Sequence, residues 1–97
     1  MPSTTPATVL RSIAANLRGR RRELGLTQDD LIERTHLDRR HLQRIERGTE
    51  NITIETLVAL ANALEVAPAK LLRAARLAPP RRGRPPEKGS ARRSKGV

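Results

Sequence analysis

Residues 27–48, TQDDLIERTHLDRRHLQRIERG, place two helix starts close together, and this arrangement constrains the fold more than any other stretch of the chain. Thr27 is a helix N-cap, with Asp30 three residues later as a variant of the capping box. Asp38 caps a second helix, which Gly48 ends. The segment therefore predicts two short helices joined by a tight turn.

The other apolar residues recur with the period of an α-helix. One helix is expected over 8–24, stopping at Gly25, one after the N-cap Thr53, and one from Pro68, which suits a first helical position. The residues expected to face inward are Leu10, Ile13, Leu17, Leu24, Leu31, Ile32, Leu42, Ile45, Ile54, Leu57, Val58, Leu60, Ala61, Leu64, Leu71, Leu72 and Ala75. Because nothing reads as a strand, the sequence predicts an all-α domain of five helices.

Charge divides the chain unevenly. The formal net charge is +10, and residues 78–97 contribute +6 of it through 7 basic side chains and 1 acidic one. This stretch holds four prolines and no large apolar residue before the last position, so it is expected to be a disordered basic tail. Residues 1–7 are expected to be a flexible lead, which leaves 8–77 as the folded domain.

The tail contains Arg82-Gly83-Arg84-Pro85, which resembles the core of an AT-hook, a short extended segment that lies in the DNA minor groove. Glycine lets the backbone approach the groove floor while the two arginines follow its walls, which favours narrow A·T-rich tracts. The alternative is a plain electrostatic tail that binds phosphates without preference.

Several classes of function are disfavoured by the composition. Cysteine is absent, which removes disulfides, zinc fingers and thiol chemistry, and the lack of aromatic residues argues against modules that stack single-stranded bases. His36 and His41 have no companions that would complete a metal site, and no catalytic constellation is visible, so we expect no enzyme activity, no metal and no cofactor. Without a signal peptide or a long apolar run, a cytoplasmic protein is expected.

The helix that starts at residue 39 carries the candidate functional residues. Leu42 and Ile45 define its inner side, so the basic side chains project outward, and the N-terminal part of such a helix lies nearest the base edges of the major groove. The residues expected to contact bases are Arg39, Arg40, Arg44 and Gln43, and those expected to contact the DNA backbone are Thr27, Gln28 and Arg47. The alternative is that these arginines form an ordinary solvated helix face.

Taken together, residues 13–72 resemble the helix-turn-helix family of the phage lambda and 434 repressors and Cro, which includes bacterial regulators of the xenobiotic-response-element type. The matching elements are Arg21, GLTQ at 25–28, Leu31, Leu37, Leu42, IERG at 45–48, Asn51 and TIETLVALANAL at 53–64. LDR at 37–39, with IERG and Asn51, is especially similar to restriction–modification controller proteins. The resemblance implies a bacterial or phage regulator, associated with the nucleoid, that binds a near-palindromic operator as a homodimer, with DNA-contacting positions at Gln28, Arg39, Arg40 and Arg44.

Three positions depart from the family pattern. Ile32 stands where a small residue is usual, which predicts a slight separation of the two helices. His36 stands where glycine is usual, so it is expected to adopt a left-handed backbone, which histidine tolerates better than most residues. Ala67 replaces the usual hydroxyl cap before the last helix.

Arg21 lies on the apolar side of the first helix, where an unpaired charge would be costly. Glu46 lies near the buried edge of the helix that starts at residue 39. We expect an ion pair between them that locks the two helices together, as the resemblance also implies. The alternative is that Arg21 extends along the surface to reach solvent.

The sequence therefore predicts a transcriptional regulator that binds double-stranded DNA as a homodimer. Leu71, Leu72, Ala75 and Leu77 are expected to be core, a dimer interface or both. An antitoxin that represses its own operon, with a toxin as partner, remains an alternative. Another is a bridging coactivator that docks to a second protein and holds nucleic acid without sequence preference. The expected regulator itself would block or contact RNA polymerase at a promoter.

Overall fold

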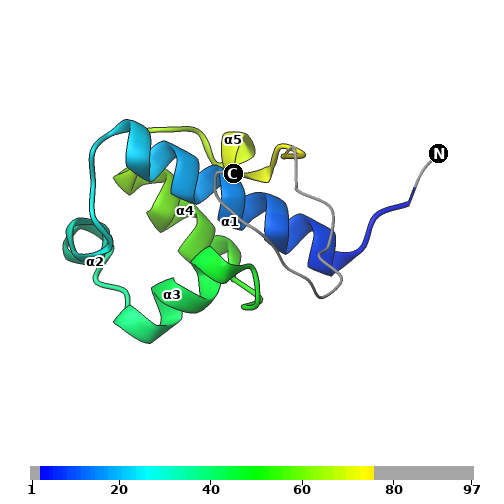
Figure 1. The fold of residues 1–97 in the computed structure, drawn as a ribbon, viewed down its shortest axis with the longest axis horizontal. Coiled ribbons are helices and arrows are strands. Elements are labelled where there is room, and N and C mark those ends of the chain that lie inside the picture. Colours follow the sequence, from blue (N-terminus) through cyan, green and yellow to red (C-terminus); the bar gives the residue numbers. More distant parts are fainter. Residues whose placement is uncertain (1–2, 76–97) are drawn as a thin grey trace, which may run out of the picture.

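The described part of the chain folds as one long helix and four shorter helices that share a core. Residues 3–75 are described by the computed structural model, and they contain no strand. The helices are α1 (Pro6–Glu23), α2 (Gln28–Thr35), α3 (Arg39–Arg47), α4 (Ile54–Ala63) and α5 (Pro68–Leu72). α1 runs across the molecule with α2 beyond one of its ends, and it contacts both α3 and α5 (Figure 1). The predicted all-α, five-helix class is confirmed for this part of the chain.

Polar caps set the helix starts. Thr27 and Asp30 form the expected capping box, in which each side chain accepts a hydrogen bond from the other residue's backbone N–H. Asp38 accepts from a backbone N–H of α3. α1 begins earlier than expected, at Pro6, because Thr5 caps it and proline suits the first turn. Part of the expected flexible lead is therefore helical.

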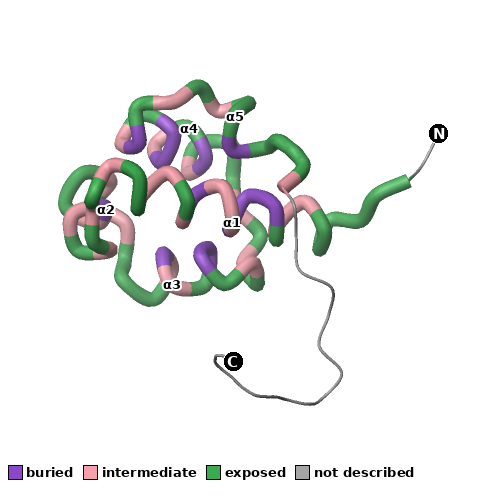
Figure 2. Tube along the Cα trace, turned by 45° about the horizontal axis from the view of Figure 1, so that its top comes forward, coloured by how far each residue is buried: buried purple, intermediate pink, exposed green. Residues whose placement is uncertain are grey.

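The core lies where the inner sides of the helices meet (Figure 2). Its buried members are Leu17, Leu31, Leu42, Ile45, Leu57, Leu60, Ala61, Leu64 and Leu71. They come from all five helices, so no helix buries its apolar side alone. Each fully buried leucine contributes about 1.5–3 kcal/mol. None of the helices in residues 3–75 is long and apolar enough to cross a membrane.

Three residues expected in the core are exposed. Val58 and Leu72 each follow a buried leucine by one position, which turns them about 100° around the helix, and they are 38% and 45% exposed. Ile54 is 72% exposed because it is the first residue of α4, beyond the part of the helix that the core covers. The predicted buried side of α4 therefore included more residues than the core covers.

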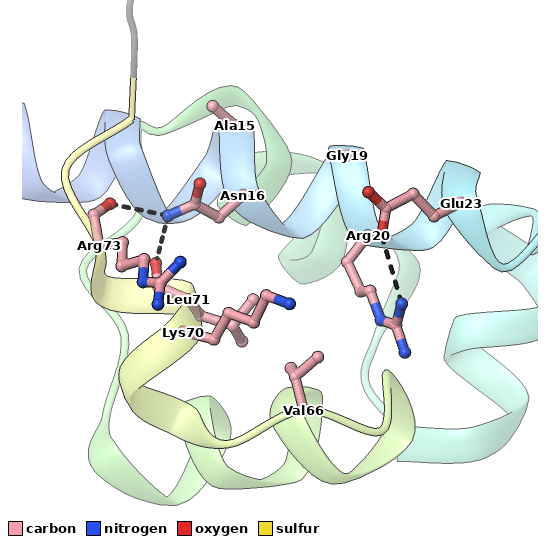
Figure 3. Close-up of a pocket in the computed structure, with 9 residues that line it drawn as sticks. All are labelled: Ala15, Asn16, Gly19, Arg20, Glu23, Val66, Lys70, Leu71 and Arg73. Carbon is pink, nitrogen blue, oxygen red and sulfur yellow. Dashed lines mark hydrogen bonds and ion pairs between the residues drawn. The ribbon is translucent and has the colours of Figure 1, made fainter.

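Two of the departures from the family pattern behave as expected. His36 ends α2 in the left-handed region, with φ 62° and ψ 22°. Ala67 precedes α5 without a side-chain cap, whereas Ile32 packs partly buried against the core. The end of α5 is instead held by Asn16 of α1, whose Nδ2 donates to the backbone oxygens of Leu71 and Arg73 at 2.9 and 2.8 Å (Figure 3).

We expect Asp30→Asn to destabilise the protein at neutral pH and to have no effect in strong acid. The backbone hydrogen bond from Thr27 lowers the pKa of Asp30 most, with its hydroxyl and then Arg34 adding to the effect. A carboxyl whose pKa is lower in the folded state stabilises that state above its unfolded value, about 4, and this stabilisation disappears as pH falls through the folded value. Urea unfolding of both proteins from neutral pH to about pH 2 measures the difference.

The matched control is Glu33→Gln, which neutralises an exposed carboxylate on the same helix. Its free energy of unfolding at neutral pH should stay close to that of the unaltered protein. A gap for Asp30→Asn that stayed constant with pH would contradict the assignment.

Candidate nucleic-acid interface

α3 presents one buried side and one basic side. Leu42, Ile45 and Glu46 are buried against the rest of the protein. The exposed arginines Arg40, Arg44 and Arg47 occupy the opposite side, and Arg39 is exposed as the first residue of the helix. Gln43 lies partly buried between them. The four base-contact candidates therefore share a helix that is anchored by its inner side.

A buried carboxylate anchors α3 to α1 and α2. Glu46 accepts hydrogen bonds from Arg21 through Nε at 2.7 Å and Nη2 at 3.1 Å, and from Gln28 Nε2 at 3.0 Å. The third donor group of Arg21, Nη1, donates to the backbone oxygen of Leu26 at 2.9 Å. Arg18 donates to the backbone oxygen of Glu46. The ion pair expected between Arg21 and Glu46 is thus the centre of a network that joins three helices.

The network lies at the edge of a polar groove of about 770 Å³. The groove is lined by Arg18, Arg21, Arg22, Gln28, Gln43, Glu46 and Arg47. Four arginines against one carboxylate favour an anion, and the groove opens beside the basic side of α3. Gln28 and Arg47, which were expected to contact the DNA backbone, both line this groove. Thr27, the third such candidate, is exposed at the start of α2, where it serves as the cap.

Two of the arginines expected to contact bases are paired with acidic side chains. Arg44 Nε donates to Glu50 Oε1 at 2.7 Å, and Arg39 Nη1 contacts Asp29 Oδ1. Arg40 forms no side-chain hydrogen bond or ion pair within residues 3–75. The basic side of α3 is therefore ordered in part by carboxylates from the neighbouring segments.

Sequence reasoning missed the roles of Asp29 and Glu50. The available indication for Glu50 was its place just after Gly48, because a chain that reverses at a helix-ending glycine returns toward that helix. The minor-groove candidates Arg82, Gly83, Arg84 and Pro85 lie outside the residues that the structure describes, as does Leu77.

Comparison with known proteins gives consistent matches to this arrangement. Residues 17–71 match the model of a helix-turn-helix family. The HTH-type transcriptional regulator y4dJ of Sinorhizobium fredii is 38% identical over 60 residues, which cover 62% of this chain and 78% of that protein.

Solved structures show the same likeness. The restriction-modification controller protein C.AhdI from Aeromonas hydrophila has a TM-score of 0.61 and 34% identity, covering 64% of this chain and 94% of its own. The controller protein C.Esp1396I, solved as a tetramer in complex with its natural 35 base-pair operator, has a TM-score of 0.60 and 33% identity, covering 65% and 83%.

Glu46→Ala should lower the free energy of unfolding by about 3 kcal/mol or more, because it leaves the buried guanidinium of Arg21 without its carboxylate. Urea denaturation measures the loss. Glu23→Ala is the control, since Glu23 is 67% exposed in its ion pair with Arg20 and its removal should cost about 1 kcal/mol at most. Equal losses in the two variants would contradict an anchoring role for Glu46.

Proposed function

Because this chain belongs to the helix-turn-helix family, whose members are DNA-binding transcription regulators and not enzymes, we propose that it acts as a homodimer on a near-palindromic operator. Each protomer places α3 in the major groove of one half-site. The observation that carries the proposal is the basic side of α3, exposed opposite a side buried through Leu42, Ile45 and Glu46. A helix fixed in this way can present side chains to base edges without moving.

The contacts divide into those that read bases and those that hold the backbone. Arg39, Arg40, Gln43 and Arg44 are assigned to bases because they lie on the exposed part of α3, and arginine matches the O6 and N7 acceptors of guanine. Thr27, Gln28 and Arg47 are assigned to phosphates because they lie at the start of α2 or at the groove beside α3. Phosphate contacts set the register of the domain, and base contacts select the sequence.

An apolar groove supports self-association. It has a volume of about 440 Å³ between the N-terminal parts of α1 and α4 and the end of α5. Its apolar lining residues are Pro6, Val9, Leu10, Ile13, Ile52, Ile54, Leu57 and Leu72. We assign a second copy of the chain to this groove, because the operator-bound relative C.Esp1396I is a tetramer. Burying the same apolar surface on two protomers would enlarge a core that is small for an isolated domain.

We expect Arg39→Ala and Arg40→Ala to weaken binding by about 1–3 kcal/mol each, and only for operators that keep the base pair each residue reads. Selection of bound DNA from a random pool gives the operator, and titration against operators with single base-pair changes measures the preference. Arg73→Ala removes the same charge at an exposed position beyond α5 and should leave the sequence preference unchanged. Failure of the unaltered protein to select any sequence would overturn the proposed function.

Ile54→Asp and Leu72→Asp should each shift the protein toward the monomer and weaken operator binding, because a carboxylate would be buried in the apolar interface. Sedimentation equilibrium measures the shift, and circular dichroism verifies the fold. Asn62→Asp places the same side chain on the exposed surface of α4 outside the groove and serves as the control. A dimer unaffected by both groove substitutions would place the interface elsewhere.

A further inference from the structure

The segment after α3 folds back over it and brings a carboxylate against its outer side. Gly48 ends α3 in the left-handed region, with φ 77°. Thr49 then donates to the backbone oxygen of Arg44, through its backbone N–H at 3.1 Å and its hydroxyl at 3.3 Å. These contacts place Glu50 beside the last turns of α3.

Glu50 holds the guanidinium of Arg44 by one edge. Arg44 Nε donates to Glu50 Oε1 at 2.7 Å, whereas Nη1 and Nη2 have no hydrogen-bond partner within residues 3–75. The guanidinium is planar, so fixing Nε also fixes the direction in which the two Nη groups point. Those two groups form a fork of donors that matches O6 and N7 of guanine.

The second oxygen of Glu50 faces another residue of α3. Glu50 Oε2 lies 3.7 Å from His41 Nε2, one turn before Arg44 on the helix. The Glu50 side chain is 29% exposed, and so it is enclosed more than an ordinary surface carboxylate. It therefore lies against two side chains of α3, the exposed Arg44 and the partly buried His41.

The pair between Arg39 and Asp29 differs in its surroundings. The Asp29 side chain is 70% exposed, and an ion pair so open to water holds its partner weakly. Arg40 has no such partner within the described part of the chain. Among the three arginines assigned to bases, Arg44 is the one held by a half-buried carboxylate.

From this geometry we propose that Glu50 is a positioning residue that fixes the Nη fork of Arg44 toward the base edges, and that it thereby determines a preference for guanine at one base pair of each half-site. The inference rests on the proposed function. Glu50 itself makes no contact with DNA, and as a negative charge near the phosphates it lowers affinity for every sequence. Its contribution is to sequence discrimination.

The test compares Glu50→Ala with Glu50→Gln in the full chain, using the operator selected by the unaltered protein and its single base-pair variants. Glu50→Ala should lose discrimination by about tenfold or more at the base pair that Arg44→Ala also affects, and at no other. Glu50→Gln should keep most of the preference, because its amide oxygen still accepts from Arg44 Nε. The double variant with Arg44→Ala should discriminate no worse than Arg44→Ala alone.

Glu33→Ala is the matched control, because it removes an exposed carboxylate of α2 that has no side-chain partner within residues 3–75. It should change affinity for all sequences alike. Thermal melting of each variant verifies that the domain is folded.

Two outcomes would overturn the inference. One is an unchanged base preference in Glu50→Ala, even with tighter binding to every sequence, which would make Glu50 only a competitor of DNA for Arg44. The other is an equal loss in Glu50→Gln and Glu50→Ala, which would remove the hydrogen bond as the cause. Both require that the unaltered protein selects an operator, so they are distinct from failure of the proposed function.

Discussion

The contact between Arg21 and Glu46 holds α3 to the rest of the domain. Removing two charges from water is expensive, and a buried pair is favourable only when its remaining donors and acceptors are satisfied. Here Glu46 accepts three hydrogen bonds, and all three donor groups of Arg21 are used. Because the partners come from α1 and α3, with Gln28 joining from α2, the network fixes α3 in orientation as well as in position.

Carboxylates contact several of the arginines on and beside α3. Glu46 holds Arg21, and Glu50 holds Arg44, whereas Asp29 contacts Arg39. Each carboxylate subtracts from the positive charge that attracts DNA, so affinity alone would favour their absence. Their presence lowers the electrostatic attraction of this surface for DNA, and in return it orients guanidinium groups.

Much of the fold could be predicted because local chemistry sets the helix ends. Thr27, Asp38 and Gly48 are strong caps, and the left-handed backbone of His36 follows from its place in the turn. The Arg21–Glu46 pair could be expected because a charge on an apolar side needs a partner.

The features of the fold that could not be predicted depend on where the helices and the core end relative to one another. Periodicity assigned Ile54 to the inner side of α4 but could not show that the core ends before it. Thr5 and Pro6 look like part of a polar lead until their cap geometry is seen. Gly48 indicates that the chain reverses after α3, but it does not indicate which side chain of α3 Glu50 then reaches, so the Arg44–Glu50 contact could not be predicted.

α1 also bears on the proposed binding to an operator. One side of it is tied to α3 through Arg21, and another is tied to α5 through Asn16. The apolar groove and α3 are therefore both attached to the same helix, α1, with no linker between them. In a symmetric pair of protomers, the structure of the domain itself would fix the separation of the two α3 helices. The protein would then require a defined spacing and helical phase between its half-sites as strictly as a defined base sequence.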